Sequence, residues 1–210
     1  MGLLDGLKAA LGLGGAAAAA ARDADPEDLF GMSTAYLTME ADLGFGTAGA
    51  AALCFSGVDS TDFTDTVREV EDILAAGAAE TGTDADLRED GRGYRWVVLH
   101  DEDVEDLVTS VHFAADTFVE RGYGSRLLAA LFAFEAGPDA AGGREGDPVY
   151  WVYSFRRGAF YPFAPRPGNE RDEQVEFKLE SVLDGELDVE DDKAYWYPLW
   201  PDDRWNHPWE

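Results

Sequence analysis

Apolar residues along this chain follow two different spacings. In residues 61–79 they recur every three or four positions, which is typical of a helix with one buried face. Residues 94–100 and 127–134 contain continuous apolar runs instead, which favour buried strands. The pattern as a whole predicts helices over residues 25–42, 61–79 and 104–121 and from residue 173 onward. It predicts strands over residues 48–56, 86–90, 94–100, 127–134, 149–155 and 159–163.

Local signals place the ends of two of these helices. Asp25 is a suitable N-cap, Pro26 fits the first helical position, and Gly44 follows the last apolar residue of the same segment. Asp103 is a second candidate N-cap, and Gly122 is positioned to end the helix that follows it. These capping residues support the first and third predicted helices independently of their apolar spacing.

The order of the predicted elements favours an α+β fold. Meander-like strands with helices at intervals indicate a largely antiparallel sheet with helices packed on it. Since no linker rich in Pro or Ser divides residues 25–200, we predict a single domain there. Residues 1–24 are predicted to form an amphipathic helix and an Ala-rich linker, and residues 201–210 a Trp-containing C-terminal tail.

The first residues of the chain have an apolar stripe when placed on a helix of 3.6 residues per turn, and Asp5 and Lys8 lie outside it. The stripe is formed by Leu3, Leu4, Leu7 and Leu11. The segment is too short and too interrupted to span a bilayer. Two interpretations are open, an interfacial helix that binds a membrane or a partner, and a helix that docks on its own domain. The membrane interpretation is weakened because Lys8 is the only cation near the stripe.

The charge balance of the chain is unusual. Its 43 acidic and 16 basic residues give a formal net charge of −27, and only three of the basic residues are lysines. A surface rich in Asp and poor in Lys suits a cytosol at molar salt, where the Debye length is about 3 Å and self-repulsion is screened. We therefore interpret the acidity as a halophilic adaptation, with a basic partner as the alternative. The charge argues against binding to a nucleic-acid backbone.

Candidate catalytic residues are sparse. The single cysteine, Cys54, lies in an apolar run, and the histidines His100, His112 and His207 have no metal-binding spacing with it or with one another. We predict no catalytic residue, no metal site and no cofactor. A small-ligand-binding or enzymatic pocket near His100 and Cys54 is one alternative, and a chaperone-like adaptor with an apolar groove on the sheet is another.

Residues 150–165, YWVYSFRRGAFYPFAP, combine seven aromatic residues with two adjacent arginines. Arginine stacks on aromatic rings and pairs with carboxylates or phosphates, so one interpretation is a partner-binding surface. Its candidate residues are Arg156, Arg157, Phe160, Tyr161 and Phe163. The other interpretation is a hairpin in the core whose arginines pair with acidic neighbours, because alternate side chains of a strand must point inward. On that view Trp151, Tyr153 and Phe155 lie on the opposite face from Tyr150 and Val152.

Four segments resemble a known family. They are MGLLDGLK, GYRWVVLHDEDVEDLVTSVHFAADTFVERGYGSRLLAALFAFE, VYWVYSFRRGAFYPFAP and WYPLW, and in this order they resemble the PspA-associated protein B (PspAB) family. The resemblance implies a non-enzymatic accessory protein that associates with a PspA-like protein in the membrane-stress (phage-shock) response. It implies a location in the cytoplasm or at the inner face of the cell membrane, and it transfers no catalytic residue to this sequence.

Overall fold

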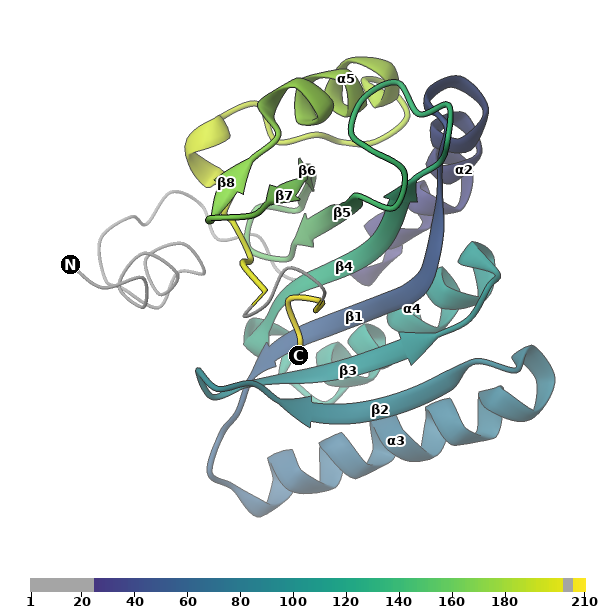
Figure 1. The fold of residues 1–210 in the computed structure, drawn as a ribbon. Coiled ribbons are helices and arrows are strands. Elements are labelled where there is room, and N and C mark those ends of the chain that lie inside the picture. The colour runs from purple at the N-terminus through teal and green to yellow at the C-terminus, as the bar shows by residue number, and fades with distance from the viewer. Residues whose placement is uncertain (1–24, 202–205) are drawn as a thin grey trace.

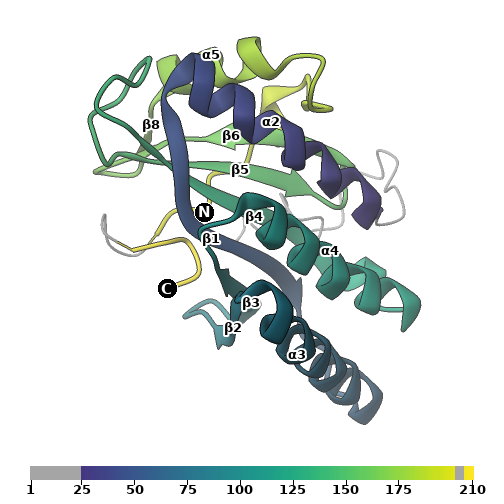
Figure 2. The ribbon, with the colours of Figure 1, turned by 90° about the vertical axis from the view of Figure 1, so that its right-hand side faces the viewer.

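Six antiparallel strands form the central sheet of the computed structural model, which describes residues 25–201 and 206–210, and helices cover one of its faces (Figures 1 and 2). The helical elements are η1 (Pro26–Gly31), α2 (Met32–Thr38), η2 (Met39–Leu43), α3 (Thr61–Thr81), α4 (Val104–Glu120), η3 (Gly124–Arg126), α5 (Glu173–Leu183) and η4 (Lys193–Tyr195). The strands of the sheet are β1 (Phe45–Ser56), β2 (Asp84–Glu89), β3 (Tyr94–His100), β4 (Leu127–Ala136), β5 (Pro148–Ser154) and β6 (Ala159–Phe163). A separate two-stranded ribbon joins β7 (Pro165–Arg166) and β8 (Glu170–Arg171). The predicted α+β class with a largely antiparallel sheet is confirmed.

The strands lie in the order β2-β3-β1-β4-β5-β6, with the long strand β1 between β3 and β4. The pairing of β1 with β4 shifts between Thr47 and Ala50, where Gly49 has a φ of 68°. Glycine adopts this left-handed conformation without steric cost, so it allows the irregular step in the ladder. As a result β1 starts at Phe45, three residues before the predicted strand, and curves across the sheet (Figure 1).

The predicted capping residues act as expected. The Asp25 side chain accepts a hydrogen bond from the Glu27 amide at 3.3 Å, and Asp103 accepts one from the Glu105 amide at 2.8 Å. Gly44 ends its helix with a φ of 70°. The segment before Gly44 is helical throughout but changes type, from 3-10 in η1 to α in α2 and π in η2.

The two faces of the sheet contribute to two separate apolar clusters. Trp151 and Tyr153 face the helices, and α3, α4, α2 and α5 lie in that order across this face (Figure 2). Tyr150 and Val152 face the other way, where side chains near the C-terminus cover them, including Trp209. The predicted alternation within residues 150–155 is therefore confirmed, and both of its faces are buried.

Two predicted segments flank the domain, residues 1–24 and 201–210. The predicted N-terminal helix, with Leu3, Leu4, Leu7 and Leu11, lies outside the described residues. Residues 206–210 pack on the second face of the sheet, so contacts with the domain extend past residue 200, where the predicted domain ended. Among the described residues, no helix has both the length and the apolar content needed to cross a bilayer.

Candidate functional site

The three aromatic candidates of the β5–β6 hairpin are core residues. The side chains of Phe160, Tyr161 and Phe163 have exposed fractions of 2%, 2% and 0%. Phe160 packs toward the helices, whereas Tyr161 and Phe163 lie in the cluster on the opposite face. In this folded state none of the three rings offers a surface to a partner. The hairpin interpretation accounts for their position.

The chain itself covers the outer edge of this hairpin. The amide of Phe160 donates to the carbonyl of Asp188 at 2.7 Å, and the amide of Glu190 donates back to the carbonyl of Phe160 at 2.8 Å. These two bonds add Val189 to β6 as a short parallel bridge. Since an exposed strand edge invites pairing with another chain, this segment protects the edge from association through β-sheet extension.

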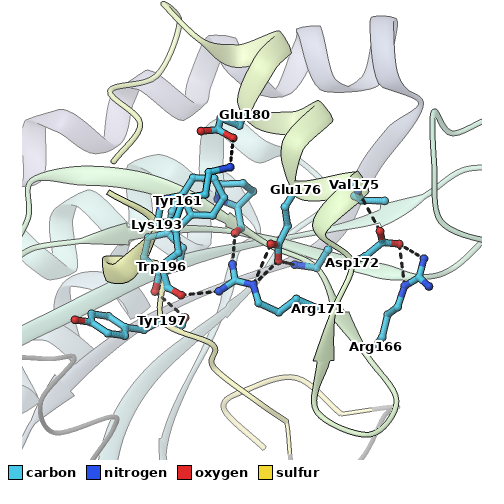
Figure 3. Close-up of polar contacts among 12 residues, drawn as sticks. Tyr161, Arg166, Arg171, Asp172, Val175, Glu176, Glu180, Lys193, Trp196 and Tyr197 are labelled. Carbon is cyan, nitrogen blue, oxygen red and sulfur yellow. Dashed lines mark hydrogen bonds and ion pairs between the residues drawn. The ribbon is translucent and has the colours of Figure 1, made fainter. Parts of the chain in front are cut away.

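Arg171 attaches the C-terminal segment to the hairpin through Trp196 (Figure 3). Its Nε lies 2.8 Å from Oε1 and 2.9 Å from Oε2 of Glu176, and its two terminal nitrogens donate to the carbonyls of Trp196 and Pro162 at 2.5 and 3.1 Å. Glu176 also accepts the amide of Ala164 at 2.9 Å. Burial raises the pKa of Glu176, while the Ala164 amide and Arg171 oppose that rise. One ion pair therefore connects β6, the start of α5 and the C-terminal segment.

Further polar contacts attach residues 193–197 of the C-terminal segment to the domain (Figure 3). The Tyr161 hydroxyl donates to the carbonyl of Tyr197 at 3.1 Å, and Lys193 pairs with Glu180 at 2.6 Å. The Lys193 ammonium also lies 4.5 Å from the ring centre of Trp196. Lys193, Trp196 and Tyr197 lie in residues 193–200, which contain the WYPLW segment, so that segment has a structural role as part of the cover over the hairpin.

The adjacent arginines Arg156 and Arg157 lie in the turn between β5 and β6, and Arg157 forms an ion pair with Glu190. Arg157 donates from Nε to Glu190 at 2.5 Å, and its guanidinium lies 3.9 Å from the centre of the Tyr195 ring. Arg156 is half-buried in the same turn. Burial raises the pKa of Tyr197, and the positive charges of Arg156 and Arg157 oppose this. Arg157 thus behaves as the core interpretation predicts, and Arg156 stays a predicted partner-contact residue.

The helix layer presents an apolar surface that the sequence pattern did not identify. We name it the helix-layer patch and define it by Phe30, Leu37 and Phe113, whose exposed fractions are 40%, 52% and 51%. The Phe30 ring packs on the ring of His112 in α4 at 4.6 Å, and His112 lies 5.7 Å from Phe113. Leu37 is exposed in α2 and follows Phe30 by seven residues, a spacing of about two helical turns that favours the same side of the helical segment. Large apolar side chains gathered at a surface often mark an interaction site.

A cavity of about 280 Å³ opens between α2 and the start of α4. Its lining includes Tyr36, Glu40, Glu102, Asp103 and Phe134. Burial raises the pKa of Tyr36, and neighbouring carboxylates raise it further. The lining is acidic, and neither Cys54 nor His100 contributes to it.

Cys54 and His100 are not brought together. Cys54 is opposite Trp96 in the β1–β3 ladder, while His100 is opposite Ala50, four positions further along. At about 3.3 Å per residue this places their backbones roughly 13 Å apart. Cys54 is buried, and this burial raises the pKa of its thiol, whereas His100 is exposed at the end of β3. Within residues 25–201 and 206–210, no group of three or more His, Cys, Asp or Glu side chains has the arrangement of a metal site.

Comparison with known proteins identifies the family of this chain. A family model described as PspAB, PspA associated protein B, matches residues 1–209. The chain belongs to the PspAB family. No curated protein and no solved structure matches it. The PspAB match includes residues 1–24 and the C-terminal segment as well as the sheet.

Proposed function

We propose that this PspAB chain is an accessory protein that associates with a PspA-type protein and acts through binding, without catalysis, in the membrane-stress response. The observation that carries the proposal is the family match over residues 1–209, since the family is named for association with PspA. The separation of Cys54 from His100 argues against the one catalytic pocket that the sequence suggested, and the proposal includes no catalytic step.

Two regions are candidates for the contact with the PspA-type protein. The first is the predicted amphipathic helix at the N-terminus, through Leu3, Leu4, Leu7 and Leu11. The second is the β5–β6 turn, where Arg156 replaces the buried rings of Phe160, Tyr161 and Phe163 as the residue to test. Arginine suits contact with an acidic partner surface because its planar guanidinium pairs with carboxylates in two-bond geometry.

The proposal places the protein in the cytoplasm, with a peripheral position at the inner face of the membrane when the N-terminal stripe is engaged. One amphipathic helix with a single lysine binds lipid weakly, because apolar burial and cationic contacts together set membrane affinity. Protein contact is therefore proposed as the main source of recruitment. The acidic surface is proposed to keep the chain soluble in a cytosol at high salt.

Affinity purification of the tagged chain from its source cell, at the salt concentration of that cell, tests this function. We expect a PspA-type protein in the eluate of the wild-type chain. The Leu3→Asp/Leu7→Asp and Arg156→Glu variants test the two contact regions separately, and Arg68→Glu on the exposed face of α3 is a matched charge control. If no PspA-type protein is recovered with the wild-type chain, the proposed association is wrong.

A further inference from the structure

The helix-layer patch contrasts with the acidic character of the chain. Phe30, Leu37 and Phe113 are each about half exposed, on a chain with a net charge of −27. Acidic residues lie next to the patch in sequence, with Glu27 before Phe30 and Asp116 one turn after Phe113. An occupant of this patch must therefore offer apolar side chains and little negative charge.

The chain provides such an occupant directly beside the patch. The described residues begin at Asp25, whose carbonyl accepts a hydrogen bond from the Tyr153 hydroxyl at 3.2 Å, so the entry point of residues 1–24 is fixed against the sheet. Phe30 follows five residues later, in the first helical element. The preceding segment therefore joins the domain at the end of the patch that Phe30 forms.

The length of the preceding segment is sufficient. A helix over residues 1–13 is about 20 Å long. Residues 14–24 can span up to about 36 Å when extended. This connection allows the helix to turn back and lie along α2 and α4. Residues 14–21 of this connection are Gly and Ala only, so they add little side-chain bulk to that turn.

Charge selects this segment over a second copy of the chain. Residues 1–21 contain one acid, Asp5, and one base, Lys8, so their formal side-chain charge is −1 + 1 = 0. A second copy would bring another formal charge of −27 toward the same acidic surface. At low ionic strength, where charges are not screened, like-charge repulsion opposes that association, while it leaves the N-terminal segment, whose side-chain charges sum to zero, unaffected.

We propose that residues 1–13 dock in cis on the helix-layer patch, with the stripe of Leu3, Leu4, Leu7 and Leu11 against Phe30, Leu37 and Phe113. Burial of these side chains removes apolar area from water on both sides of the contact. The docked segment is then unavailable to a membrane or a partner until it leaves the patch. This contact is a property of the isolated chain, so its failure would not affect the proposed association with PspA.

A cysteine placed in the patch reports whether the segment covers it. Thr34 is exposed on the outer face of α2 between Phe30 and Leu37, and the native Cys54 is buried, so Thr34→Cys provides a single accessible thiol. The rate of maleimide labelling is measured in the full-length chain with the native N-terminus and with Leu3→Asp/Leu7→Asp. We expect labelling to be about fivefold slower with the native N-terminus, which corresponds to a patch covered roughly four-fifths of the time.

Controls distinguish docking in cis from other causes. Ala79→Cys, exposed near the end of α3 and away from the patch, should label at one rate in both backgrounds. Phe113→Asp should raise the labelling rate of Thr34→Cys as the two leucine changes do, because it removes the contact on the side of the patch. Equal labelling of Thr34→Cys in both backgrounds would overturn the proposal. Protection that increases with protein concentration would also overturn it, in favour of a second copy.

Discussion

Arg171 and Glu176 form an ion pair that joins three separate parts of the fold. Their side chains are 19% and 5% exposed, and both oxygens of the carboxylate lie within 2.9 Å of the same guanidinium nitrogen. The other guanidinium nitrogens bind two backbone carbonyls, including that of Trp196 in the C-terminal segment. The pair therefore has a structural role in attaching that segment to the hairpin.

Replacing Arg171 with Leu should destabilise the domain strongly. The change leaves the Glu176 carboxylate buried without its counter-ion and two carbonyls without a donor, so we expect a loss of about 3–5 kcal/mol in the free energy of unfolding. Urea unfolding at constant salt measures this loss. Arg68→Leu is the matched control because its pair with Asp65 is exposed, and we expect a change of about 0–0.5 kcal/mol there. A loss at Arg171 as small as that at Arg68 would contradict the structural role.

Trp209 should contribute to stability although it lies one residue from the end of the chain. Its side chain is 1% exposed and packs against Trp96 and Tyr150 on the second face of the sheet. Trp209→Ala removes this cover, and we expect about 3–5 kcal/mol of destabilisation, the usual range for a buried Trp. Trp200 is only partly buried, so Trp200→Ala should cost less. If Trp209→Ala unfolds at the same denaturant concentration as the wild-type chain, the packing of residues 206–210 is not important for stability.

The sheet and its hairpins could be predicted from the sequence because their signals are local. Strand alternation placed Trp151 and Tyr150 on opposite faces, and capping residues such as Asp103 located the helix starts. The cover over the hairpin has no such signal. Residues 184–201 carry neither helical nor strand periodicity, and the bond from Arg171 to Trp196 joins positions far apart in the sequence.

The helix-layer patch could also be predicted only in part from the sequence. Apolar spacing in α4 places Phe113 off the buried stripe, so its exposure could be inferred locally. Its neighbour Phe30 belongs to a distant helix, and only the packing of α4 against η1 brings the two together through His112. Sequence periodicity identifies the face of each helix but not which helices lie side by side.

The two arginines of the β5–β6 turn should differ in their effect on stability. Arg157→Ala leaves Glu190, whose side chain is 8% exposed, without its charged partner, and we expect a loss of about 1.5–3 kcal/mol. Arg156 is half-buried in the same turn, and we expect Arg156→Ala to cost less than Arg157→Ala, because Glu190 then keeps Arg157 as its charged partner. Thermal or urea unfolding of both variants tests this difference. Equal losses would mean that Arg156 is also structural, and Arg156→Glu would then be unsuitable as a test of partner binding.

The ring of His207 makes the stability of the C-terminal packing depend on pH. Its Nδ1 lies 2.9 Å from the Tyr150 hydroxyl, and the ring stacks on Trp209 at 4.5 Å. Burial lowers the pKa of His207, the charges of His100 and Arg88 lower it further, and Glu210 opposes them. The folded chain therefore resists protonation of a ring that the unfolded chain protonates at about pH 6.5.

The sign of the pH dependence follows from this difference. Below about pH 6.5 the unfolded state binds a proton that the folded state does not, so the free energy of unfolding should fall as the pH is lowered from about 7.5 to about 5.5. The stabilisation that the neutral His207 ring provides is fully present above the pKa of this ring in the unfolded chain, about 6.5. His207→Gln should reduce this slope, because glutamine retains a polar group near Tyr150 but does not titrate. Urea unfolding across this range gives the slope, and an NMR titration of the His207 ring should give a midpoint below about 6.5. A wild-type slope no steeper than that of His207→Gln would show that another group causes the pH dependence.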